Sequence, residues 1–263
     1  MQTGAIVGNI DVAQMVFTAF VIFFFLLIRY LQRESNREGF PLRDNDGRVV
    51  PNYGGLCGIP PTKTFILPEG GVAYSPPRNT DDVIPTRGVA TAEFLGAPMD
   101  PTGNPLLSGI GPASYNAARI DVPSYTYFGD KNPRIVPLSA DDHHALAFDG
   151  PNPIGYTVIG ADREIGGTIS DVWFDRSEQF IRYYEVLTTP ALGGRKVLVP
   201  APLADVQPRN EIVSVPSILG AQFKDVPGTK SPVQVTLLEE DKISGYYGGG
   251  TLWATPARSE PLI

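Results

Sequence analysis

The residues best suited to acid–base chemistry lie in one acidic stretch, residues 171–178 (DVWFDRSE), with Arg182 and Glu185 a few positions downstream. Carboxylates can pass protons inward when burial and neighbouring charges shift their pKa values. One hypothesis for Asp175 and Glu178 is therefore a proton relay. The alternative is a turn between two strands that carries only solvated charges, since many surface carboxylates contribute nothing measurable. The residues alone leave both interpretations open.

Two histidines form a second candidate group in the run Asp141, Asp142, His143, His144. In an extended chain, Asp141 and His143 share one face, and Asp142 and His144 share the other. Each face then offers one carboxylate and one imidazole, fewer than the three or four ligands of a zinc site. The pattern favours a solvated loop or adventitious surface metal binding over a built metal centre. Histidine still titrates near physiological pH, so the loop can exchange protons.

Signatures of other chemistry are absent. The chain has no P-loop, no G-x-S-x-G and no H-E-x-x-H motif. We therefore predict no metal site and no catalytic residue. No motif supports a membrane-anchored hydrolase. A single cysteine, Cys57, cannot form an internal disulfide. With 21 basic and 28 acidic residues among 263, the net charge is −7 and no basic stripe is present. Nucleic-acid binding is therefore disfavoured.

An apolar run near the N-terminus predicts a transmembrane helix over residues 12–31. Residues 12–28 are uncharged, and the run continues around Arg29 to about the 20 residues that a span requires. A signal peptide would need a basic start, but residues 1–28 contain only one charge, Asp11. Arginines follow the run at positions 29, 33, 37, 43 and 48, which predicts an external N-terminus and a cytoplasmic C-terminal part. Arg29, Tyr30 and Arg33 are expected to meet lipid headgroups.

The rest of the chain must position the candidate acids. Residues 39–112 are rich in turn signals, with one strand expected at 64–67, and this pattern indicates an extended segment that lies on the surface of another protein. Short strand-like runs follow at 134–138, 155–159, 168–174, 181–187, 196–199 and 211–215. Their spacing predicts a small antiparallel barrel or folded sheet.

A helix is expected over residues 235–245, with Gly245 as its C-cap and residues 248–250 as a flexible turn. The predicted organisation is an external N-terminus (1–11), a transmembrane helix (12–31), an extended docking segment (32–115) and a cytoplasmic mainly-β domain with a short C-terminal helix (116–263).

Six segments in register resemble the H subunit of the photosynthetic reaction centre of purple bacteria, whose small β-barrel is the PRC-barrel. They are residues 30–42 (YLQRESNREGFPL), 63–68 (KTFILP), 101–105 (PTGNP) with 109–115 (GIGPASY), 134–137 (RIVP), 171–178 with 182–186 (RYYEV), and 235–243 (VTLLEEDKI) with 246–256 (YYGGGTLWATP). The resemblance covers nearly the whole chain and follows the family's order behind a single span.

The resemblance implies a subunit in the bacterial inner (intracytoplasmic) membrane that binds no pigment or other cofactor itself. It would cap the cytoplasmic face of the L and M subunits, which carry bacteriochlorophyll, bacteriopheophytin, quinones, non-haem iron and a carotenoid. It would stabilise the quinone region and line the proton route to the secondary quinone. Membrane lipids, a cytochrome subunit and a light-harvesting antenna are further expected partners. By position, Glu178 and Asp175 match the family's acids on that route, with Arg182 beside them to hold its neighbours ionised.

One departure from the family leaves the point of proton uptake open. Some members carry two histidines, preceded by an aspartate, just before the segment that matches residues 134–137. Here that place reads YFGDKN over residues 127–132, without histidine. Asp130 could serve instead, or His143 and His144 could approach from the following loop. A tethered PRC-barrel adaptor for a non-photosynthetic cytoplasmic partner is the alternative function, because a fold does not by itself determine a function.

Overall fold

The computed structural model describes residues 5–7, 10–39, 57–68, 70–76, 87–94, 97–117, 119–127 and 129–259. The chain separates into two compact units, one of residues 1–67 and 72–80, the other of residues 68–71 and 81–263. Each unit is described by itself below. Arg43, Arg48 and most of the predicted turn signals between residues 40 and 56 lie outside the described residues.

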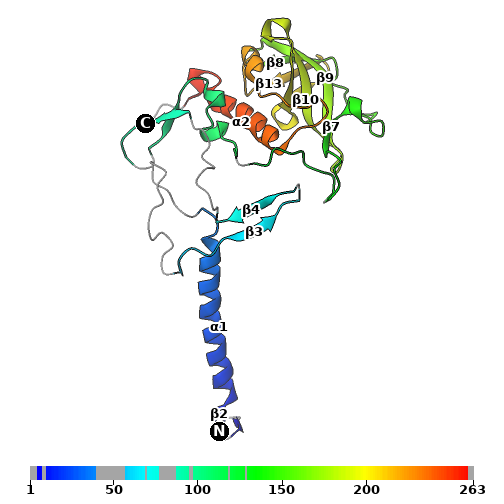
Figure 1. The fold of residues 1–263 in the computed structure, drawn as a ribbon. Helices are drawn as coiled ribbons and strands as arrows, with labels where there is room; N and C mark the ends of the chain where they lie inside the picture. The colour runs from blue at the N-terminus through cyan, green and yellow to red at the C-terminus, as the bar shows by residue number, and fades with distance from the viewer. Residues whose placement is uncertain are drawn as a thin grey trace. The chain divides into compact units, whose positions relative to one another are not determined.

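The first unit is built on one long helix, α1 (Val12–Ser35), preceded by the short strands β1 (Ala5–Val7) and β2 (Ile10–Asp11) (Figure 1). Asp11 caps the helix, because its carboxylate accepts the N–H groups of Ala13 and Gln14 that have no partner inside the helix. No side chain of α1 is buried in the chain by itself. A helix with this much exposed apolar surface requires lipid or another protein around it, and α1 is long and apolar enough to cross a membrane.

Buried polar residues join the end of α1 to the hairpin of β3 (Lys63–Ile66) and β4 (Val72–Ser75). The Arg37 guanidinium binds the Glu34 carboxylate and donates to the carbonyl oxygens of Pro61 and Ser75, at 2.7 and 2.8 Å. The Ser75 hydroxyl donates back to the carbonyl of Arg37. These bonds connect the hairpin to the helix end within the first unit. The strand β3 confirms the strand predicted at 64–67.

The second unit contains a seven-stranded sheet with one helix, α2 (Leu237–Trp253), beside it (Figure 1). Its strands are β7 (Ile135–Pro137), β8 (Thr157–Gly160), β9 (Ile165–Asp175), β10 (Phe180–Thr188), β11 (Lys196–Pro200), β12 (Asp205–Gln207) and β13 (Ile212–Val215). A separate two-stranded sheet pairs β5 (Gly88–Ala90) with β6 (Met99–Pro101).

The order of the main sheet is β11–β10–β9–β8–β13–β12, with β7 paired to the last residues of β9. The predicted mainly-β fold with a C-terminal helix is confirmed. Two details differ from the prediction. The β8–β13 pair is parallel. Among the described strands, the outer strands β11 and β12 are not hydrogen-bonded to each other, so the sheet is not closed into a barrel.

The core lies between the sheet and α2. Trp173 on β9 is fully buried, as are Ile243, Tyr246 and Tyr247 on α2. At about 25 cal/mol per Å² of buried apolar surface, such large side chains dominate the stability of the sheet–helix unit. Trp173 therefore anchors the end of β9 in the core, close to the turn that joins β9 to β10.

The predicted end of the second helix was wrong. The helix runs through Gly245 and the glycines at 248–250 to Trp253, eight residues beyond the predicted C-cap. A Cβ atom on Gly248 would lie 2.5 Å from the carbonyl oxygen of Pro112, and one on Gly250 would lie 2.3 Å from that of Ser217. These glycines let two backbone segments approach the helix, so they serve close packing and not a flexible turn.

Candidate functional site

The turn between β9 and β10 places the acidic stretch at one end of the sheet. Asp175 ends β9, and its Oδ1 accepts the backbone N–H groups of Ser177 and Glu178 at 2.9 and 3.0 Å. The N–H of Gln179 donates to the Asp175 carbonyl oxygen at 2.7 Å. An aspartate suits this position because its short carboxylate can bond the backbone two residues on. The predicted turn is thus confirmed, but its charges are not all solvated as that interpretation expected, because the Asp175 side chain is buried.

Arg134 joins the two acids of this turn. Its Nε donates to Asp175 Oδ2 at 2.7 Å, and its terminal nitrogen donates to Glu178 Oε1 at 2.6 Å. Arg134 reaches them because β7, which follows it, pairs with β9 so that Ile135 lies opposite Asp175. The Asp175 side chain is fully buried, whereas that of Glu178 is 51% exposed. One arginine therefore connects a buried carboxylate to one in contact with water.

Arg182, expected beside these acids, is not bound to either of them. Its guanidinium stands 5.3 Å from the centre of the Phe180 ring, and no ion pair joins it to Asp175 or Glu178 within the described part of the chain. The arginine that compensates their charge is Arg134, which was not singled out from the sequence. The only signal for it was its place in the segment 134–137 that resembles the family.

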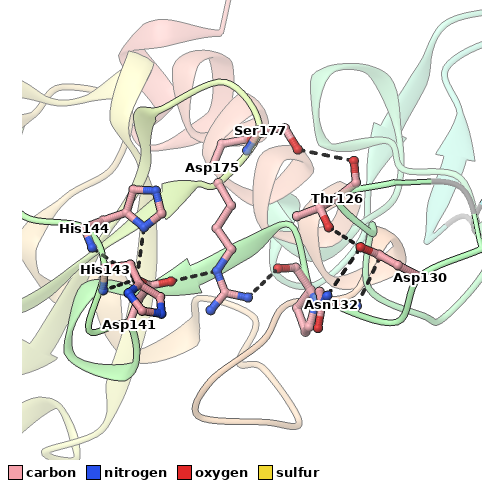
Figure 2. Close-up of polar contacts among 10 residues, drawn as sticks. Thr126, Asp130, Asn132, Asp141, His143, His144, Asp175 and Ser177 are labelled. Atoms are coloured by element: carbon pink, nitrogen blue, oxygen red, sulfur yellow. Dashed lines mark hydrogen bonds and ion pairs between the residues drawn. The ribbon is translucent and has the colours of Figure 1, made fainter.

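Asp141 anchors the two histidines beside the same turn (Figure 2). Its carboxylate binds the Nε of Arg176 at 2.8 Å and the Nδ1 of His144 at 3.0 Å, and it accepts the backbone N–H groups of His143 and His144. The bond to His144, the backbone bond from His143 and the nearby Arg176 hold the pKa of Asp141 well below its usual range. Asp141 is thus a fixed anion that orients His144, while His143 remains exposed.

Asp130 lies on the other flank of the turn in Figure 2. Its Oδ2 accepts the Thr126 hydroxyl at 2.6 Å, and its Oδ1 accepts the N–H of Asn132 at 3.2 Å. The Thr126 bond, followed by the backbone bond from Asn132, lowers the pKa of Asp130. The turn itself connects both flanks, because Arg176 also donates to the carbonyl of Pro133 and the Ser177 hydroxyl contacts the carbonyl of Thr126.

The structure therefore brings both candidate uptake points to the Asp175–Glu178 turn. The histidines approach from one side and Asp130 from the other, so the two alternatives left open by the sequence belong to one surface cluster. Its members are Thr126, Asp130, Arg134, Asp141, His143, His144, Asp175, Arg176 and Glu178, called below the turn cluster. Among the described residues, no group of three or more histidine, cysteine, aspartate or glutamate side chains could hold a metal ion.

A polar cavity of about 340 Å³ lies next to the turn cluster. Its lining comprises Arg119, Ser124, Arg134, Ile135, Arg182, Tyr183, Leu237, Glu240, Asp241 and Ser244. Arg134 thus belongs to both sites, with its guanidinium bound to Asp175 and Glu178. Two acids of this lining, Glu240 and Asp241, were not singled out from the sequence. The preceding Glu239 forms the capping box with Thr236, whereas Glu240 has no such task and stands one turn before the buried Ile243.

A further carboxylate, Glu185, lies in the middle of β10. Its Oε1 accepts the Ser170 hydroxyl and binds the Lys196 ammonium, at 2.7 and 2.8 Å, and its Oε2 accepts the Trp173 indole N–H at 3.2 Å. The Glu185 side chain is only 5% exposed. All three partners are donors, so this acid ties neighbouring strands together.

The residues predicted to face lipid lie near the end of α1. Arg29 and Tyr30 are exposed and Arg33 is half-buried. Their contact with lipid headgroups stays a prediction.

Two family models match the chain. Residues 147–222 match the PRC-barrel domain, which together with α1 defines a PRC-barrel protein with an apolar N-terminal helix of membrane-spanning length. Residues 4–140, more than half of the chain, match the N-terminal region of the photosynthetic reaction centre H chain. The chain therefore belongs to the reaction centre H-chain family, as its sequence resemblance indicated. Members of this family are accessory subunits that associate with the reaction centre core, and α1 fits a membrane anchor.

Proposed function

We propose that this H subunit caps the cytoplasmic face of the L and M subunits, stabilises the quinone region and conducts protons toward the secondary quinone. The observation that carries the proposal is the Asp175–Arg134–Glu178 arrangement, in which one guanidinium bridges a buried and a half-exposed carboxylate. The tethered adaptor is disfavoured because the H-chain match covers the residues that a generic barrel would not need.

Proton transfer in this scheme begins at the turn cluster. Glu178 faces water and can accept a proton, which weakens its bond to Arg134 and frees that arginine to pair more closely with Asp175. Glu178 then gives the proton to the next acceptor toward the quinone, a water molecule or a group of the L and M subunits, and its return to the ionised form restores the bridge to Arg134. In this scheme protons enter at His143 and His144, while Asp130, whose pKa is lowered by the Thr126 bond, stays ionised and attracts protons to the cluster.

The membrane arrangement belongs to the same proposal. Arginines at the C-terminal end of α1 favour an external (periplasmic) N-terminus and a cytoplasmic second unit. The subunit then meets the L and M subunits from the side on which protons are taken up. In this proposal the L and M subunits bind the pigments, quinones and iron. The H subunit covers their cytoplasmic face and supplies proton-conducting side chains.

The substitution Glu178→Gln in the assembled reaction centre tests the relay. It keeps the side-chain shape but cannot carry a proton, so the proton-coupled second reduction of the secondary quinone should slow about 100-fold or more, which is the lower end of general acid–base effects. The first electron transfer should change far less. Flash-induced absorption kinetics separate the two steps.

The matched control is Glu164→Gln, which makes the same change at an exposed glutamate in the turn at the opposite end of β9. It should leave both steps unchanged. Equal slowing of both steps by Glu178→Gln, or no slowing, would remove Glu178 from the relay.

A complementary experiment tests the partners. The chain is isolated from native membranes in mild detergent, and near-infrared absorption of the complex is recorded. Bacteriochlorophyll and bacteriopheophytin bands that bleach in light are the expected result. A colourless complex would instead indicate a different partner.

A further inference from the structure

Glu240 on α2 and Tyr183 on β10 form a hydrogen-bonded pair at the wall of the polar cavity. The Tyr183 hydroxyl donates to Glu240 Oε2 at 2.7 Å, and the two residues are 57 positions apart in the chain. The Tyr183 side chain is buried and Glu240 is half-buried. The pair is thus withdrawn from bulk water but open to the cavity.

Several charged groups face Glu240. Arg182 comes from β10, Asp241 from α2, and Arg119 and Arg134 from the segments before and after residue 124. Arg134 is already bound to Asp175 and Glu178, whereas Arg119 and Arg182 form no ion pair within the described residues. Glu240 therefore has cations nearby without a direct salt bridge to any of them.

This environment makes Glu240 more easily protonated than an ordinary glutamate. Burial raises the pKa of Glu240, and the Asp241 charge acts in the same direction, against the Tyr183 bond and the charges of Arg182 and Arg119. Burial, together with the Glu240 charge, also raises the pKa of Tyr183. The phenol consequently keeps its proton, and the carboxyl is the member of the pair that can gain or lose one.

We propose that Glu240 is a second proton-binding group of this subunit, which takes up a proton through the polar cavity when negative charge forms on the secondary quinone. A proton from water forms an O–H bond with the carboxylate, while no group of this chain is oxidised or reduced. Arg134, shared by the cavity and the turn cluster, links this group electrostatically to Glu178. The inference rests on the proposed function only for the source of the negative charge.

The experiment uses the assembled reaction centre carrying Glu240→Gln. Light-minus-dark infrared spectra should lose a protonated-carboxyl band that the unsubstituted complex shows on quinone reduction. Proton uptake per first electron, followed with a pH-indicator dye, should fall over the pH range in which that band titrates.

Two further variants act on the same group in opposite directions. Tyr183→Phe removes a hydrogen bond that favours the ionised carboxylate, so the uptake curve should move up by about one pH unit. Asp241→Asn removes a like charge, so the curve should move down. Glu164→Gln again serves as the control and should move nothing.

An unchanged infrared spectrum and uptake curve in Glu240→Gln would overturn the inference. If that variant fails to assemble, the opposite shifts of Tyr183→Phe and Asp241→Asn decide the question, and no shift in either contradicts it. A Glu178→Gln variant with normal quinone kinetics would instead count against the proposed relay. That result would leave the infrared band of Glu240 intact.

Discussion

The turn and the middle of the β9–β10 hairpin both hold carboxylates against basic side chains, but with different surroundings. In the middle, Glu185 is buried and accepts bonds from Ser170, Trp173 and Lys196. At the turn, Glu178 is half-exposed, and its one side-chain partner among the described residues is Arg134. A carboxylate enclosed by donors stabilises the fold, whereas one with water on one side and one exchangeable partner can move a proton.

The same contrast exists inside the turn. Asp175 is as enclosed as Glu185 and accepts bonds from two backbone N–H groups and Arg134. It resembles the middle of the hairpin more than it resembles Glu178, three residues away. Hence Asp175 organises the site, and Glu178 is the better candidate for transfer.

The largest expected loss of stability comes from Asp175→Ala. The variant leaves the Arg134 guanidinium and two backbone N–H groups without their acceptor, at a cost of about 3 kcal/mol in the free energy of unfolding. Denaturant unfolding of the full chain in detergent measures it. Asp175→Asn, which keeps an acceptor for the turn, should cost less. A loss no greater than that of Glu178→Ala would contradict the distinction.

Glu185→Ala should follow at about 2 kcal/mol, because the buried Trp173 N–H loses its acceptor. The exposed Lys196 can turn to water, so Lys196→Met should cost less than Glu185→Ala. In reaction centres that assemble, the second quinone reduction should keep its rate. Slower reduction would show that the middle of the hairpin also takes part in proton transfer.

Asp141→Asn should lower stability by about 1 kcal/mol near neutral pH through weaker bonds to Arg176 and His144. Because the folded state lowers the pKa of Asp141, its contribution is complete above the ordinary aspartate pKa of about 3.9. It is lost as the pH falls through the lower folded value. The difference between variant and unsubstituted chain should therefore shrink below about pH 4. A difference independent of pH would mean that the charge of Asp141 is not what stabilises the loop.

The smallest change in stability is expected for Glu178→Gln, within about 0.5 kcal/mol, since exposed ion pairs contribute little. The same variant should have the largest effect on the second quinone reduction. At this residue, a small change in the free energy of unfolding would thus accompany a large change in the rate of the second quinone reduction. A loss of stability as large as that of Asp175→Ala would place Glu178 with the structural carboxylates instead.

Much of the framework could be predicted from local patterns. The uncharged run after Asp11 predicted α1, and six strand-like runs predicted six of the seven strands of the main sheet. The strand β12 was missed because residues 205–207 are short and half-polar. The C-terminal helix was predicted to end at Gly245 because glycine is common just after a helix end. In the structure the helix continues to Trp253, and the backbone of residues 112–114 packs against its glycines.

Local patterns were sufficient to predict the membrane-length helix, the strand-rich second unit, the turn at residues 175–178 and the family, because hydrophobic runs, turn residues and ordered motifs can be read from neighbouring residues. The pairing of charged side chains, in contrast, depends on the three-dimensional fold. Arg134 reaches Asp175 across 41 positions, Arg176 reaches Asp141 across 35, and Tyr183 reaches Glu240 across 57. Such contacts depend on strand register and on how α2 packs against the sheet, and neither is encoded within a few neighbouring residues.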